Sequence, residues 1–193
     1  MIDNENYVHA SLTKKDYIKI ESMITNLYVE LKIKKLPISP FFVALKKGFL
    51  VIPYSKIDKE TREFLRDKEI SGMSGRNVNG QYKIIYDDAD HEERQRFTVA
   101  HEIGHILLGH KEDSEYAEKC ANYFASYFLV PTPMVEKVKC EDFLDVSDKF
   151  SVSLSCAVHA FDRYNRWLFF GGYKYKEYEI KMLENFKKIK NNI

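Results

Sequence analysis

One short run of residues restricts this chain to a fold with a buried helix that carries polar side chains. The run extends from Arg96 to His110 and contains the pattern His-Glu-x-x-His, formed by His101, Glu102 and His105. Four residues make about one helical turn, so both imidazoles leave the same face and can bind one metal ion. Glu102 is placed to activate a water molecule without being a ligand itself. The pattern is typical of a zinc-dependent peptidase.

The residues around this pattern are apolar or small, which indicates that the helix is buried. They are Phe97, Val99, Ala100, Ile103, Gly104, Ile106, Leu107 and Leu108. A helix that is apolar on most sides lies in a core, where unpaired polar groups cost several kcal/mol. A metal ion would give the two histidines and the glutamate a partner.

Length and composition predict a single globular domain. The chain has 193 residues, of which 45% are hydrophobic and 31% charged, and its net charge is +1. This balance argues against a protein built around a phosphate backbone. We expect one domain over residues 1–193, with the metal-site core at about 15–138 and a helical C-terminal extension at about 139–193. No signal peptide and no apolar run long enough to span a bilayer is present in the sequence, so no membrane partner is expected.

The cysteines favour a reducing compartment. Cys120, Cys140 and Cys156 are odd in number and widely spaced, so they form neither a disulfide framework nor a Cys-x-x-Cys zinc pair. Together with the missing secretion signal, they predict a cytoplasmic location.

Apolar periodicity predicts mainly helices with a small sheet. Helices are expected at about 16–35, 41–45, 58–67, 90–108 and 113–130, with a short helix after Pro131, mostly helical structure at 141–165 and a lysine-rich helix at the end. Strands are expected at about 48–54, 70–73, 81–86 and 167–175. The loop with Gly75, Asn77, Asn79 and Gly80 indicates that 70–73 and 81–86 form a hairpin or a pair of sheet strands. Asp90 with Glu93 resembles a capping box at the start of the metal helix, and Gly109 is its expected stop. Thr132 is expected to cap the short helix after Pro131.

Two histidines leave the metal site incomplete, because catalytic zinc takes three protein ligands and a water. A third histidine in the extended pattern is excluded, since Lys111 occupies its position. His110 is expected to face away from the other two at about 100° per helical residue. Glu118 and Asn122 lie one turn apart on the following helix and share a face with small residues. Spacing leaves Glu118 open as a ligand or as a solvated residue of an acidic helix start.

Both helices resemble the ImmA/IrrE family of bacterial metallopeptidases. The resemblance rests on the stretch that begins at Arg96 and on Glu118-x-x-Ala-Asn-x-Phe-Ala-x-x-Phe-Leu-Val-Pro131. The departures are Phe128 and Val130, where Leu and Met are more usual, and they are expected to change only packing. The resemblance implies an α+β fold, a compact zincin-like metallopeptidase domain that is mainly helical with a small β-sheet.

The resemblance also assigns roles to the site residues. It implies that His101, His105 and Glu118 bind one Zn²⁺ and that Glu102 is the catalytic base. Asn122 would orient a ligating histidine or would bond the backbone. The donor set favours zinc but also accepts manganese or cobalt. Five side chains remain open as donors to the reacting oxygen: Tyr82, Tyr86, His91, Tyr116 and Tyr164.

For function, the resemblance implies an intracellular regulatory protease that cleaves a helix-turn-helix repressor and so derepresses a mobile element or stress operon. The alternative is a catalytically weak, metal-containing regulatory or DNA-binding module, in which residues 146–155 belong to a helix-turn-helix. There Ser153 would cap a helix that carries Arg163 and Arg166. Direct nucleic-acid binding is not expected, because no basic stripe is concentrated there. A purely structural zinc site would not need Glu102. The sequence gives no oligomeric state.

Overall fold

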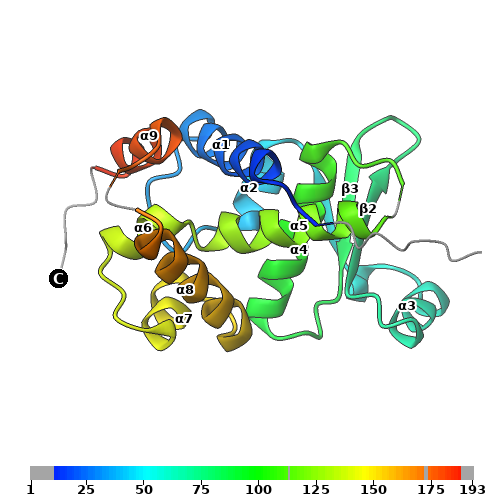
Figure 1. Cartoon of the computed structure of the whole chain (residues 1–193). Helices are drawn as coiled ribbons and strands as arrows, with labels where there is room; N and C mark the ends of the chain where they lie inside the picture. The colour runs from blue at the N-terminus through cyan, green and yellow to red at the C-terminus, as the bar shows by residue number, and fades with distance from the viewer. Residues whose placement is uncertain (1–10, 113, 172–173, 188–193) are drawn as a thin grey trace, which may run out of the picture.

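The computed structural model describes residues 11–112, 114–171 and 174–187. Within them the helices are α1 (Lys14–Glu30), α2 (Pro40–Lys46), α3 (Lys59–Asp67), α4 (Glu92–Leu108), α5 (Glu115–Leu129), α6 (Thr132–Lys137), α7 (Phe143–Phe150), α8 (Leu154–Phe169) and α9 (Glu177–Asn185), besides a short 3₁₀ turn (Tyr54–Lys56). The strands are β1 (Leu50–Pro53), β2 (Gly72–Arg76) and β3 (Tyr82–Tyr86). The α+β class, mainly helical with a small sheet, is therefore as predicted (Figure 1).

The three strands form one sheet in the order β1-β3-β2. β2 and β3 pair antiparallel, which confirms the predicted pairing of these two segments, and β1 pairs parallel to β3. The turn between β2 and β3 needs Gly80, whose φ is +77°. That angle lies in the left-handed region, which glycine enters without steric cost.

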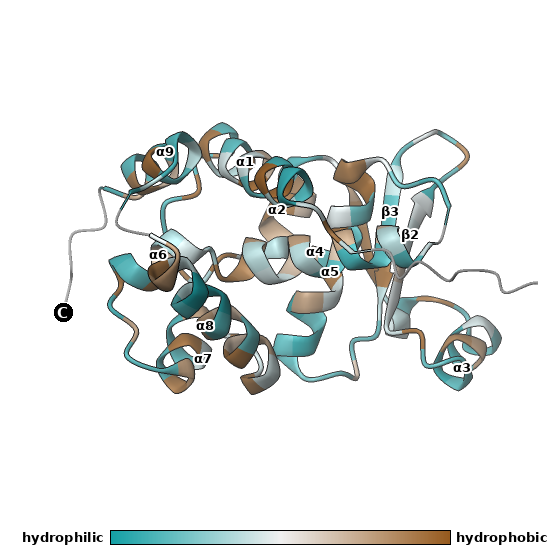
Figure 2. Cartoon of the chain, viewed as in Figure 1, coloured by the Kyte–Doolittle hydropathy of each residue, from teal (hydrophilic) through white to brown (hydrophobic). Residues whose placement is uncertain are grey.

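Helices α4 and α5 form the middle of the molecule (Figure 1). The sheet and α3 lie on one side of this pair, and α6, α7, α8 and α9 lie on the other. The main hydrophobic cluster runs through all of these layers except α3, from Ile20 on α1 through Val99 and Phe128 to Phe186 after α9. Figure 2 shows hydrophobic and hydrophilic residues on the same helices, as expected for helices with one buried face.

The sequence predicts a strand at about 167–175, and this prediction is wrong. Helix α8 continues through Trp167 to Phe169, while residues 172 and 173 lie outside the described residues. The aromatic run has a high β propensity, but tertiary packing overrides it. The Trp167 ring packs between Tyr164 and Tyr175, and its Nε1 donates to Oε1 of Glu179 at 2.9 Å.

Three predicted helix starts are also corrected. α1 begins at Lys14 rather than Asp16, because Thr13 and Asp16 form a capping box. α4 is preceded by His91, without a side-chain cap, so the predicted capping box of Asp90 with Glu93 does not form. Acidic residues of the first turn still complement the helix dipole there. α6 is preceded by Pro131, which makes Thr132 its first residue rather than its cap.

None of the helices in the described segments has the length and apolar composition that a membrane crossing requires.

Candidate metal centre

Helix α4 ends and is anchored at defined points. Gly109 takes φ +74° and stops the helix, as predicted. Near the start of α4, the buried Arg96 guanidinium donates to the carbonyl oxygens of Ile38, Phe150 and Ser151 at 2.9, 3.3 and 3.1 Å. Burial lowers the pKa of this guanidinium. Three acceptors from two distant segments fix the position of α4 in the core.

Helix α5 packs against α4 at very close range. Its N-terminus is capped by Ser114, whose hydroxyl accepts from the Ala117 amide at 3.1 Å. A Cβ atom added at Gly104 on α4 would lie 3.0 to 3.1 Å from atoms of Phe124 on α5. Ala100 and Ala121 are fully buried. Small residues on both helices therefore bring α5 close enough for its first turns to meet the histidines of α4.

The side chains of His101, His105 and Glu118 converge at one point. The two histidine Nε2 atoms lie 2.9 Å apart. Glu118 places Oε1 3.1 Å from His105 Nε2 and Oε2 3.4 Å from His101 Nε2. A tetrahedron with metal–ligand bonds of about 2.05 Å has an edge of about 3.3 Å. The donor atoms therefore have the separation that a tetrahedral ion such as zinc requires.

The surroundings of His101 suit a metal ligand. Its Nδ1 lies 3.1 Å from Oδ1 of Asn122, so its Nε2 is left for the cluster. Burial lowers the pKa of His101, and His105 beside it adds to the effect, although Glu118 opposes it. The neutral imidazole is the form that binds metal. Asn122 thus orients a histidine of the cluster, one of the two roles left open by the sequence.

His110 does not face away from the cluster, contrary to the prediction. Its Nδ1 lies 3.1 Å from Nδ1 of His105. The prediction extended the helical rotation past Leu108, but the chain turns at Gly109, and the His110 amide bonds back to the His105 carbonyl at 3.1 Å. His110 therefore contacts the ring nitrogen of His105 that points away from the cluster.

Glu102 lies on α4 between the two histidines and is buried, with 7% of its surface exposed. Burial, followed by the charges of Asp87 and Glu102, raises the pKa of Tyr54 to about 12. The side chain of Glu118, by contrast, is 48% exposed. The cluster is therefore open to solvent beside Glu118 and closed around Glu102.

Comparison with protein families gives one match over residues 63–162, just over half of the chain, to the IrrE N-terminal-like domain of peptidases. The chain belongs to the ImmA/IrrE family of metallopeptidases. The matched segment holds all of α4, α5, β2 and β3, and therefore the whole His-His-Glu cluster. Comparison with curated proteins finds no match.

Four of the five side chains left open as donors to the reacting oxygen have other contacts in this ImmA/IrrE domain. Tyr116 donates to Asp16 at 2.7 Å, and Tyr164 donates to Glu136. The Tyr82 hydroxyl accepts from Arg76. Tyr86 packs edge-on against Phe41, and His91 precedes α4. None of these contacts leads to the cluster.

A groove of about 1200 Å³ begins beside the cluster, and the sequence did not predict it. Phe97, whose ring lies 6.5 Å from that of His101, and Asn122 line its near end. We call it the α5–α8 groove, lined among others by Asn122, Tyr123 and Ser126 on α5 and by His159, Arg163 and Trp167 on α8. Its walls come from helices that are far apart in the chain, so no local motif indicates it.

Proposed function

We propose that this chain is a zinc-dependent endopeptidase that cleaves a helix-turn-helix repressor in the cytoplasm. The observation that carries the proposal is the convergence of His101, His105 and Glu118 beside the buried Glu102. Membership of a metallopeptidase family supports it. The repressor, and with it the derepression of a mobile element or stress operon, is what the resemblance to regulatory members of the family implies.

The residues of the site divide the chemistry among them. His101, His105 and Glu118 would hold the ion, while Asn122 orients the His101 ring. A zinc ion held there would lower the pKa of a bound water and polarise the scissile carbonyl. Glu102 would accept the proton of the attacking water and later deliver it to the leaving amine.

The edge strand β2 supports a peptide as substrate. It lies at one edge of the sheet and packs directly on α4, since a Cβ at Gly72 would lie 2.3 Å from Cγ2 of Thr98. Thr98 is one helical turn before Glu102 on the same side of α4. An edge strand offers unpaired backbone groups, to which an extended peptide can add as a further strand.

The helix pair α7 and α8 does not favour the DNA-binding alternative. The Arg163 guanidinium, which that alternative assigns to nucleic acid, donates to the Val130 carbonyl at 2.6 Å and to the Ser126 hydroxyl at 2.8 Å. These bonds hold it against α5 and the start of α6. A base or phosphate would have to displace them.

The test is metal content by elemental mass spectrometry, followed by a cleavage assay. We expect about one zinc per chain in the wild type and in Glu102→Gln, and its loss in Glu118→Ala, because three protein ligands are needed. The matched control is Glu115→Ala, an exposed acid one turn earlier that lies outside the cluster. Repressors encoded beside the gene are then incubated with each protein, and only Glu102→Gln among the zinc-loaded forms should fail to cut. Wild type without zinc after zinc is added back would refute the proposal.

A further inference from the structure

The α5–α8 groove carries an excess of positive charge. Seven Lys and Arg residues and three Glu residues line it, whereas the whole chain has a net charge of only +1. Two of the acids, Glu21 and Glu179, are buried. Glu21 accepts from the hydroxyls of Tyr123 and Tyr178. Glu179 accepts from Trp167 and from the Lys176 amide. Two of the three acids are thus bonded inside the protein, while the third, Glu93, is exposed.

Most of the basic side chains, by contrast, form no ion pair within the residues that the structure describes. Lys119 pairs with Glu115, and Lys176 lies 3.8 Å from Glu21. The other five have no ion-pair partner within the described parts of the chain; they are Lys14, Arg94, Arg163, Arg166 and Lys174. Like charges gathered in one groove attract an anionic partner and reject a basic one.

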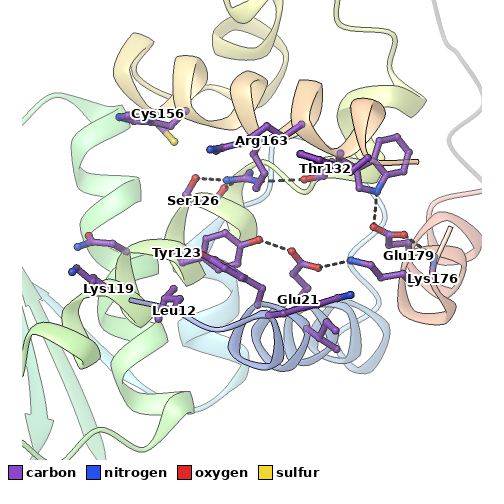
Figure 3. A pocket seen from close by; sticks show the side chains of 18 of the residues that line it. Leu12, Glu21, Lys119, Tyr123, Ser126, Thr132, Cys156, Arg163, Lys176 and Glu179 are labelled. Carbon is purple, nitrogen blue, oxygen red and sulfur yellow. Dashed lines mark hydrogen bonds and ion pairs between the residues drawn. The ribbon is translucent and has the colours of Figure 1, made fainter. Parts of the chain in front are cut away.

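Arg163 shows that this charge is held in place and is not a mobile surface charge. Its donors meet only neutral acceptors: the Ser126 hydroxyl and carbonyl, the Val130 carbonyl and the Thr132 hydroxyl. Its guanidinium carbon also lies 5.7 Å and 5.5 Å from the ring centroids of Tyr123 and Tyr127. Figure 3 shows Arg163 directed from α8 towards α5 across the groove. Its positive charge is fixed without being neutralised.

The shape of the groove fits a polypeptide segment. Its volume of about 1200 Å³ exceeds the usual range of small-molecule sites, about 300 to 1000 Å³. α8 forms one wall, and α1 with α5 forms the opposite one (Figure 3). A helix that reads DNA must enter the major groove, and on the groove side of α8 Arg163 is already bonded to α5. Tyr17, Phe97 and Trp167 add aromatic surface for apolar side chains.

The groove passes close to the metal cluster, because Asn122, which lines it, also contacts His101. Ser126 follows Glu118 by eight residues on the same helix, a distance of about 12 Å along α5. An extended peptide covers that distance in about four residues. We propose that the α5–α8 groove binds an acidic segment of the protein substrate, about four residues to one side of the scissile bond. This inference rests on the proposed peptidase function.

The test measures binding of a labelled peptide by fluorescence anisotropy, on zinc-loaded Glu102→Gln protein so that the peptide is not cut. The probe has about twelve residues, enough for the cluster and the groove at about 3.4 Å per residue, with Glu and Asp in one half. A second probe carries Gln and Asn at those positions. We expect the acidic probe to bind about tenfold more tightly at low salt, and the difference to shrink at high salt.

Two matched double variants locate the binding. Arg166→Glu with Lys174→Glu reverses charges that line the groove, and it should abolish the preference for the acidic probe. Arg62→Glu with Lys68→Glu makes the same change in charge at α3, at the other end of the molecule, and should keep the preference (Figure 1). Urea midpoints of both variants check that the fold is intact.

Equal affinity for the two probes, or an equal loss in both double variants, would overturn the inference. So would duplex DNA that binds with the same charge dependence while the acidic probe does not bind. If the acidic probe binds in a charge-dependent way but active protein never cuts it, the groove proposal is supported and the proposed peptidase function is refuted. If active protein cuts both probes equally well, the peptidase function is supported and the groove proposal is refuted.

Discussion

Gly104→Ala tests whether close packing of α4 on α5 builds the metal site. The added methyl group would lie 3.0 Å from Cδ1 and 3.1 Å from both Cβ and Cγ of Phe124, whereas carbon atoms prefer about 3.5 to 4.0 Å. The Phe124 ring is fully buried and stacks on Phe128 at 5.9 Å between centroids. It therefore has little room to turn aside, and α5 has to move away from α4 by a few tenths of an ångström.

The expected magnitudes follow from that displacement. Overpacking of this kind costs about 1 to 3 kcal/mol, and replacing glycine inside a helix returns about 1 kcal/mol. The net loss in the free energy of unfolding is about 1 kcal/mol. The effect on metal binding is larger in relative terms, because α5 carries Glu118 and metal–ligand distances tolerate only about 0.2 Å. We expect zinc to bind at least about tenfold more weakly, equivalent to about 1.4 kcal/mol.

Urea unfolding of the metal-free protein and competition with a chromophoric chelator measure the two effects separately. Gly75→Ala on β2 is the matched control, since a Cβ there meets nothing within 4 Å, and its stability should change by less than about 0.5 kcal/mol. If Gly104→Ala became more stable than wild type and bound zinc equally well, the close approach of the two helices would not be what positions Glu118.

Three further variants test other contacts. His110→Ala removes the partner of the outer ring nitrogen of His105, so zinc affinity should fall about 10- to 100-fold in the same chelator competition; unchanged affinity would leave His110 a bystander. Arg96→Met leaves three carbonyl oxygens without their donor and should lower the free energy of unfolding, measured in urea, by about 2 to 4 kcal/mol. A loss below about 0.5 kcal/mol would contradict the anchoring role of Arg96. Burial raises the pKa of the Cys140 thiol to about 11 from 9.0, so folding disfavours the thiolate. The contribution of the neutral thiol to the free energy of unfolding is therefore complete below pH 9 and is lost as the pH rises towards 11. Across that range the free energy of unfolding of wild type should fall relative to that of Cys140→Ala. A difference that does not change with pH would contradict the raised pKa.

Much of the His-His-Glu cluster could be predicted because it is local in sequence. The spacing of His101 and His105 places both rings on one face of any helix, and Gly109 stops that helix where expected. The strand pair β2 and β3 also followed from its own turn signals. In each case the residues that decide the structure lie within a few positions of one another.

The errors arise where a distant contact or the end of a helix decides the direction of a side chain. Trp167 is helical because Tyr164, Tyr175 and Glu179 surround its ring, although an aromatic run favours a strand. His110 reaches His105 because the helix has already ended, so that helical rotation no longer describes its direction. Spacing likewise left Glu118 open, since the contact of Gly104 with Phe124 that brings it near is between two helices.

The α5–α8 groove lies beyond sequence reasoning for the same reason, and its position has a consequence for the site. Helix α5 presents Glu118 to the cluster and, two turns later, Ser126 to the groove. Arg163 binds Ser126 and Val130 at the end of the same helix, so α8 and α5 are joined there by hydrogen bonds. The metal cluster and the α5–α8 groove are therefore both built on α5, and the bonds of Arg163 fix the end of that helix against α8.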